Sequence, residues 1–65
     1  MFFKDLKQKD TFTVVSGFDI ASGMKHLVYM KVSKSQAKVV DQVGFGNIRC
    51  VGDVQPIGSL ATVFQ

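Results

Sequence analysis

The sequence has one cysteine, one histidine, no tryptophan and no glutamate. One cysteine excludes an intramolecular disulfide, which fits a reducing compartment and rules out a disulfide-stabilised mini-protein. One histidine and one cysteine are also too few ligands for a structural zinc site, so we predict no metal and no other cofactor. The chain of 65 residues must therefore hold its fold by core packing, or gain stability from oligomerisation, as small domains often do.

Long hydrophobic runs are absent as well. The longest stretch without a charged residue is residues 54–65, far short of the roughly 20 apolar residues that a membrane-spanning helix needs. Near the N-terminus, Lys4 and Asp5 interrupt the apolar cluster, so this segment lacks the pattern of a secretory signal. These absences predict a soluble, cytoplasmic protein with no membrane partner.

The composition that remains is typical of a folded protein. Hydrophobic residues make up 46% of the chain and include six phenylalanines, so the chain has enough apolar side chains for a core. Every acidic residue is an aspartate, a residue that favours turns over helix interiors. No long window repeats with the 3.6-residue period of a helix. We predict one all-β domain that spans residues 1–65.

The most regular stretch is residues 26–41, which we expect to form a β-hairpin with its turn at Lys34-Ser35. Apolar residues occur at every second position before the turn, as they do in a strand that has two different faces. The predicted core face pairs Val32 with Ala37 and Met30 with Val39. The predicted outer face pairs Lys31 with Lys38 and Tyr29 with Val40.

Shorter extended segments are expected on both sides of this hairpin. Before it, Phe2 or Phe3 should anchor the N-terminus together with Leu6, next to one helical turn, and residues 10–16 should form a strand with Phe12 and Val14 in the core. After it, residues 41–43 should extend the hairpin, and residues 48–51, 54–57 and 60–64 should form further strands. Pro56 indicates a sheet edge or a strand end. We expect residues 17–25 to form a loop.

Three of these features resemble small SH3-like β-barrels: the charged segment at residues 5–12, the long loop, and the strand Val28-Tyr29-Met30-Lys31-Val32-Ser33. The layout is also similar to short phage-encoded proteins that open with Phe-Lys-Asp-Leu-Lys and later show a Val-Tyr-x-Lys-x-Ser strand. The resemblance implies a small SH3-like barrel of five or six short antiparallel strands, in a viral setting and hence a host cytoplasm. It implies no catalytic residue.

The residues available for catalysis are few. His26 is the only histidine that could act as a general base, and Cys50 is the only cysteine nucleophile. Cys50 lies in an alternating apolar stretch, where a buried and inert thiol is the usual outcome. A pair between the two side chains stays open, because separation in the sequence does not decide distance in space. We predict that the protein is not an enzyme.

A basic sheet face is the first candidate binding site. The net charge is +3, and the expected pairing places Lys31 beside Lys38, a like-charge pair that costs stability. Basic faces that carry an aromatic residue bind phosphates and bases. We therefore predict that an anionic ligand, either nucleic acid or a nucleotide, binds at Tyr29, Lys31, Lys34, Lys38 and Arg49. The alternative is that these lysines only keep an exposed sheet soluble and block edge pairing.

An apolar loop is the second candidate site. Phe18, Ile20 and Met24 either fold back over an open end of the barrel or form an exposed contact surface for a host protein. Phe45 lies between Gly44 and Gly46 in a turn that needs positive φ, where it either closes the core or contacts a partner. The second predicted function is thus a protein-interaction module or inhibitor. Homo-oligomerisation is expected with either function.

Overall fold

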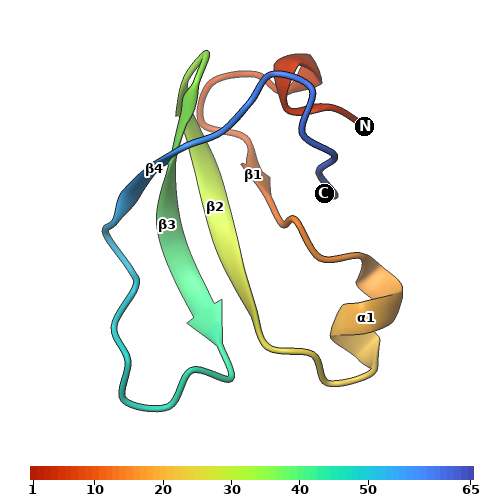
Figure 1. The fold of residues 1–65 in the computed structure, drawn as a ribbon, viewed down its shortest axis with the longest axis vertical. Helices are drawn as coiled ribbons and strands as arrows, with labels where there is room; N and C mark the ends of the chain where they lie inside the picture. The colour runs from red at the N-terminus through yellow and green to blue at the C-terminus, as the bar shows by residue number, and fades with distance from the viewer.

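Two long antiparallel strands form the centre of the sheet. The computed structural model describes residues 1–65, and in it β2 (His26–Ser33) and β3 (Gln36–Val43) are joined by the predicted turn at Lys34 and Ser35. Two short strands, β1 (Thr11–Phe12) and β4 (Val54–Pro56), complete one antiparallel sheet in the order β1-β2-β3-β4. Figure 1 shows β2 and β3 as the long axis of the molecule. The all-β prediction is confirmed, with four strands in one sheet.

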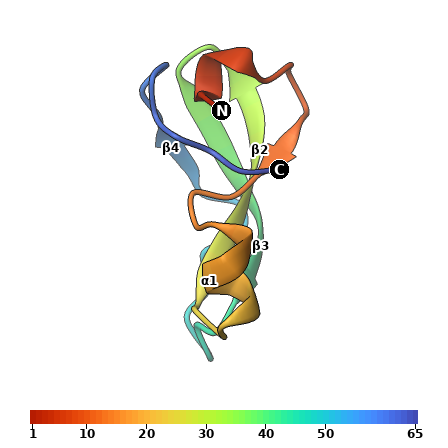
Figure 2. The ribbon, with the colours of Figure 1, turned by 90° about the vertical axis from the view of Figure 1, so that its right-hand side faces the viewer.

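Short segments at the two ends of the chain lie beside each other. The 3-10 helix η1 (Phe3–Asp5) provides the helical turn expected near the N-terminus. The C-terminal segment forms isolated antiparallel bridges from Thr62 to Phe2 and from Phe64 to Thr13. Figures 1 and 2 show this segment returning across the sheet to the side where the chain begins. The strand expected at residues 60–64 is therefore reduced to single bridges.

The core is small and aromatic. Its seven buried residues are Phe3, Leu6, Phe12, Tyr29, Ala37, Val39 and Val63. The Phe12 ring stacks on Tyr29 and meets Phe3 edge-on, with 5.4 Å between ring centroids in both pairs. Such aromatic pairs add roughly 0.5–1.5 kcal/mol each beyond their burial. The predicted anchor thus consists of Phe3 and Leu6, whereas Phe2 is exposed.

The predicted register of the hairpin is wrong by one position in its centre. Lys31 lies opposite Ala37, Met30 opposite Lys38 and Tyr29 opposite Val39. Two irregularities, between Lys31 and Ser33 and between Val28 and Tyr29, leave Val32 and Val40 without a cross-strand partner. Because paired residues share a face of the sheet, Tyr29 and Lys31 turn inward and Met30 turns outward.

Other element boundaries also differ from those that the sequence predicts. The chain bends after Thr13, so Val14 is exposed and does not join the core. Residues 48–51 form no strand, and their backbone is held by the side chain of Gln42 instead. The expected loop contains a short helix, α1 (Gly17–Ala21). Pro56 ends the edge strand β4, as predicted.

Candidate interaction site at the α1 end

The helix α1 is a single short turn with its own caps. Ser16 is the N-cap, and its Oγ accepts a hydrogen bond of 3.2 Å from the Asp19 amide. The Ser16 hydroxyl also donates to the Asp19 carboxylate at 3.0 Å. At the other end, the Ser22 hydroxyl donates to the Phe18 carbonyl at 3.0 Å. A serine three residues before an acidic residue is a local N-cap signal, but five residues are too few to show helical periodicity.

The apolar side chains of this segment do not close the end of the sheet. Phe18 is 81% exposed and Met24 is 52% exposed, while Ile20 is half-buried. None of the residues of α1 is buried. Of the two interpretations of the loop, the geometry therefore favours an exposed apolar surface. We call Phe18, Ile20 and Met24, with the cavity described next, the α1 surface.

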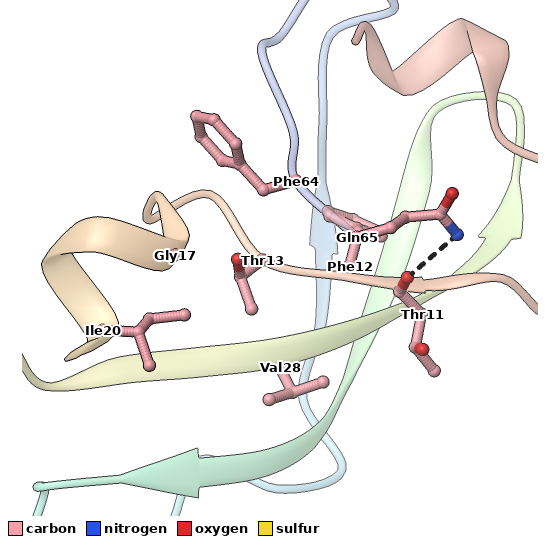
Figure 3. A pocket seen from close by; sticks show the side chains of 8 residues that line it. All are labelled: Thr11, Phe12, Thr13, Gly17, Ile20, Val28, Phe64 and Gln65. Atoms are coloured by element: carbon pink, nitrogen blue, oxygen red, sulfur yellow. Dashed lines mark hydrogen bonds between the residues drawn. The ribbon is translucent and has the colours of Figure 1, made fainter.

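A cavity of about 220 Å³ lies between α1, the sheet and the C-terminal residues. We call it the Ile20 cavity, and Figure 3 shows its lining: Thr11, Phe12, Thr13, Gly17, Ile20, Val28, Phe64 and Gln65. The Thr13 hydroxyl donates to the Val15 carbonyl at 2.7 Å, and the side-chain amide of Gln65 donates to the Thr11 carbonyl at 3.3 Å. The lining carries no charged side chain. Four of the eight lining residues are hydrophobic, and Thr11, Thr13 and Gln65 add polar groups, so the cavity is mixed in character.

Lys31 lies in the interior and not on a ligand face. Its side chain is 7% exposed, and its ammonium donates to the carbonyls of Leu6 at 2.7 Å and Phe3 at 3.1 Å. The ammonium also lies 4.6 Å from the centroid of the Phe3 ring. The long apolar stem of lysine makes such burial tolerable when the charged end finds acceptors. Lys31 therefore attaches the N-terminal segment to the sheet, and the predicted pairing with Lys38 does not form.

Tyr29 is also buried. Its ring stacks on Phe12, and its hydroxyl donates to the Gln55 side chain at a long 3.4 Å. Burial raises the pKa of the Tyr29 hydroxyl above 10.0, and negative charge on Cys50 raises this pKa further. Neither Tyr29 nor Lys31 faces a ligand in solution.

The other three predicted ligand residues are exposed but lie on separate segments. Lys34 is in the turn between β2 and β3, Lys38 is on the outer face of β3, and Arg49 is in the loop that follows β3. Arg49 lines a cavity of about 430 Å³, which we call the Arg49 cavity, together with Gln42, Gly46, Asn47, Ile48 and Val51. The five predicted residues are thus not brought together at one site.

Gln42 is a residue that sequence analysis missed. Its side-chain oxygen accepts hydrogen bonds from the amides of Cys50 at 2.6 Å and Val51 at 3.3 Å, and its side-chain nitrogen donates to the Ile48 carbonyl. The side chain therefore holds the loop that carries Arg49. A glutamine near a strand end gives no sequence signal for this role, because its partners follow only from the path of the loop.

Phe45 and His26 lie close to the segment that links α1 to β2. Phe45 is half-buried, and the Lys25 ammonium lies 5.5 Å from the centroid of its ring. Gly44 has a φ of +86°, so the predicted turn with positive φ is confirmed. His26 is buried at the start of β2, where its Nδ1 is 3.0 Å from the Met24 carbonyl. These contacts hold the segment between α1 and β2 in position.

Comparison with known proteins finds no matching family model, no matching curated protein and no matching solved structure. No helix has the length and apolar character needed to span a bilayer. No three histidine, cysteine or acidic side chains lie close enough to hold a metal ion. Function must therefore be inferred from the site itself.

Proposed function

We propose that this protein is a non-enzymatic interaction module that docks on another protein through the α1 surface. One observation carries the proposal: the Phe18 ring is 81% exposed on a helix whose caps do not involve that ring. Exposed aromatic side chains beside apolar concave surfaces are typical of protein contacts. Aromatic residues also supply much of the binding energy at such contacts.

The local structure supports docking through a preorganised surface. Ser16 and Ser22 hold α1 at its two ends, so the backbone that carries Phe18 is ordered before a partner arrives. Ordering a flexible loop on binding costs free energy, and a capped helix reduces that cost. The Ile20 cavity, which Gly17 and Ile20 of the same helix line, gives a partner a depression to contact.

For the fold, we propose a small open barrel of the SH3-like type, whose fifth extended segment is residues 60–64. The bridges of Thr62 with Phe2 and of Phe64 with Thr13 support it, because they bring the last segment back to the first strand. A phage origin with a partner in the host cytoplasm stays a prediction from the resemblance of the sequence.

Photo-crosslinking tests the proposed contact. A photo-reactive phenylalanine analogue replaces Phe18 in one variant and Leu60, which is 66% exposed, in a control variant. After irradiation in the cells that produce the protein, we expect a discrete crosslinked product from position 18 and none from position 60. Adding excess unlabelled Phe18→Asp protein should not compete for the partner, whereas wild-type protein should. Identical products from both positions would exclude a specific α1 surface.

Binding of an anionic ligand is the second candidate function, and the position of Arg49 favours it. Arg49 lines the larger, more polar Arg49 cavity, which has no acidic residue in its lining. Lys34 and Lys38 are also exposed, but Lys31 and Tyr29 are excluded from this version of the site. A nucleotide or a short stretch of nucleic acid is the ligand class that such a cation would bind.

Salt dependence tests this second candidate. Affinity for a single-stranded oligonucleotide should fall with added salt, and Arg49→Gln should reduce the slope by about 0.7 if it removes one phosphate contact. Lys7→Gln is the control, because Lys7 is an exposed cation outside the cavity. Equal effects of the two variants would show diffuse charge attraction without a site.

A further inference from the structure

The net charge of the chain lies at one end of the molecule. Residues 1–10 and residues 31–35, around the turn of the hairpin, contain five lysines and two aspartates, which accounts for the whole net charge of +3. The other residues carry three basic and three acidic side chains and are neutral. Figures 1 and 2 show η1 and the β2–β3 turn together at the end of the molecule far from α1. We call residues 1–10, 31–35 and 58–60 the basic end.

Most cations of the basic end are accessible. Lys31 is buried, whereas the other four lysines are exposed: Lys4, Lys7, Lys9 and Lys34. The Asp5 carboxylate accepts a hydrogen bond of 3.0 Å from the Phe2 amide, and the Asp10 carboxylate accepts one of 2.9 Å from the Lys7 amide. Both carboxylates of this end are thus hydrogen-bonded to the backbone, while four lysine side chains are exposed to an incoming anion.

Lys9 occupies a backbone position that favours glycine. Its φ is +76°, and no other residue except glycine has a positive φ. The Lys9 amide donates to the Lys31 carbonyl at 2.8 Å, which holds this turn against β2. A side chain costs free energy in this region of φ, and such outliers point to a role for the side chain. Here the side chain adds a cation to the basic end.

Exposed apolar side chains lie among these cations. Leu60 is 66% exposed and Phe2 is 44% exposed. The Lys4 amide donates to the Ser59 carbonyl at 2.9 Å and Phe2 forms a bridge with Thr62, so the two apolar side chains come from adjacent segments. The Lys4 ammonium lies 5.8 Å from the centroid of the Phe2 ring. The basic end therefore combines exposed cations with exposed apolar side chains.

We propose that the basic end binds the surface of a membrane that contains anionic lipids, with Phe2 and Leu60 in the headgroup region and the four exposed lysines on the lipid anions. Stable binding of this kind needs two signals, and the basic end supplies both charge attraction and apolar insertion. A single-stranded nucleic acid explains the cations and the Phe2 ring, but Leu60 has no ring that could stack on a base.

This contact differs from the other contacts discussed above. The sequence predicts no membrane partner because no segment is long and apolar enough to span a bilayer, whereas a surface contact needs no such segment. The α1 surface lies at the opposite end of the molecule, so a chain on a membrane would still present it to a partner protein. The proposal is therefore independent of the proposed function and can fail without it.

Co-sedimentation with lipid vesicles is the first test. The chain should bind vesicles in which about one third of the phosphatidylcholine is replaced by phosphatidylserine, and it should be released as salt rises to about 0.5 M, because salt screens the attraction. Vesicles of phosphatidylcholine alone should not retain it. Absence of binding to the anionic vesicles, or equal binding to both kinds, overturns the proposal.

Two double variants of equal net charge locate the contact. One combines Lys9→Gln with Lys34→Gln at the basic end, and the other combines Lys25→Gln with Lys38→Gln at exposed positions elsewhere. Each lysine near an anionic surface raises affinity about fivefold, so the first variant should bind anionic vesicles about 25-fold more weakly and the second less than about threefold more weakly. Equal losses would show diffuse charge attraction and overturn the basic end as the site.

Leu60→Asp tests the apolar part of the contact. It should lower the affinity for anionic vesicles about tenfold or more, because a side chain that enters the headgroup region is replaced by a charge of the same sign as the lipids. Ile48→Asp is the matched control, since Ile48 is 65% exposed but lies outside the basic end. If Leu60→Asp and Ile48→Asp bound equally well, insertion at this end would be excluded and the proposal overturned.

Lys9→Gly separates binding from stability. Glycine fits a φ of +76°, so the urea midpoint should not fall, while the affinity for anionic vesicles should fall about fivefold. Unchanged affinity would overturn the role of Lys9 in the contact. A single-stranded oligonucleotide measures the alternative ligand and should not displace the wild-type chain from anionic vesicles at an equal concentration of phosphate. Displacement would make the basic end a nucleic-acid site and overturn the membrane contact.

Discussion

Replacement of the buried lysine is the sharpest test of the fold as described. Lys31→Met keeps most of the apolar stem and removes the ammonium, and with it the hydrogen bonds to the carbonyls of Leu6 and Phe3. The Phe3 carbonyl still accepts from the Leu6 amide at 3.1 Å, but the Leu6 carbonyl loses its partner. The attraction between the ammonium and the Phe3 ring is lost too.

The expected magnitude follows from these losses. An unsatisfied buried carbonyl costs about 1–3 kcal/mol, and a cation over an aromatic ring contributes about 0.5–2 kcal/mol. Relief of the desolvation of the ammonium offsets part of this loss, so we expect Lys31→Met to lower the free energy of unfolding by about 2 kcal/mol. For a chain of 65 residues the total is only about 3–10 kcal/mol, so the effect is a large share of it.

Urea denaturation followed by circular dichroism measures this change. Lys38→Met is the control, because Lys38 is exposed on the neighbouring strand and should change stability by no more than about 0.5 kcal/mol. If the two variants were equally stable, Lys31 would not be buried as described, and the register of the hairpin would have to be revised. A lysine on an open ligand face would instead affect binding and leave stability almost unchanged.

Three further predictions concern Tyr29, Gly44 and Gln42. The ultraviolet absorbance of the only tyrosine should titrate above 10.0. Because the folded-state pKa of Tyr29 is raised, its contribution to the free energy of unfolding should be constant below pH 10 and fall as the pH rises through the folded pKa. Gly44→Ala should cost about 1–3 kcal/mol in urea denaturation, since φ is +86° and the new Cβ would lie 2.7 Å from the Lys25 Cβ; an unchanged midpoint would contradict this geometry. Gln42→Ala should speed hydrogen exchange at the Val51 amide but not at the Val39 amide, and equal protection in both proteins would show that Gln42 does not hold the loop.

The candidate site could be predicted in part. The sequence singled out Phe18, Ile20 and Met24, but it left open whether they fold back over an end of the barrel or form an exposed contact surface. The cavity that Gly17 and Ile20 line could not be foreseen, since Val28 and Phe64 contribute to it from segments far apart in the chain. The prediction of a basic ligand face was wrong because it required Tyr29 and Lys31 to lie on the outer face of β2. Both side chains are buried, so the residues predicted to bind one ligand do not share a face.

Local chemistry in the sequence was sufficient for the all-β class, the turn at Lys34 and Ser35, the aromatic anchor at the N-terminus and the strand end at Pro56. Only the tertiary structure decided which face of β2 is inside, because both of its faces carry apolar residues and the two-residue period is the same for either. The inward face is set by partners distant in the chain. Tyr29 stacks on Phe12 and donates a hydrogen bond to Gln55, and the Lys31 ammonium donates to the carbonyls of Phe3 and Leu6. Without those acceptors, burial of a charged ammonium would be strongly unfavourable.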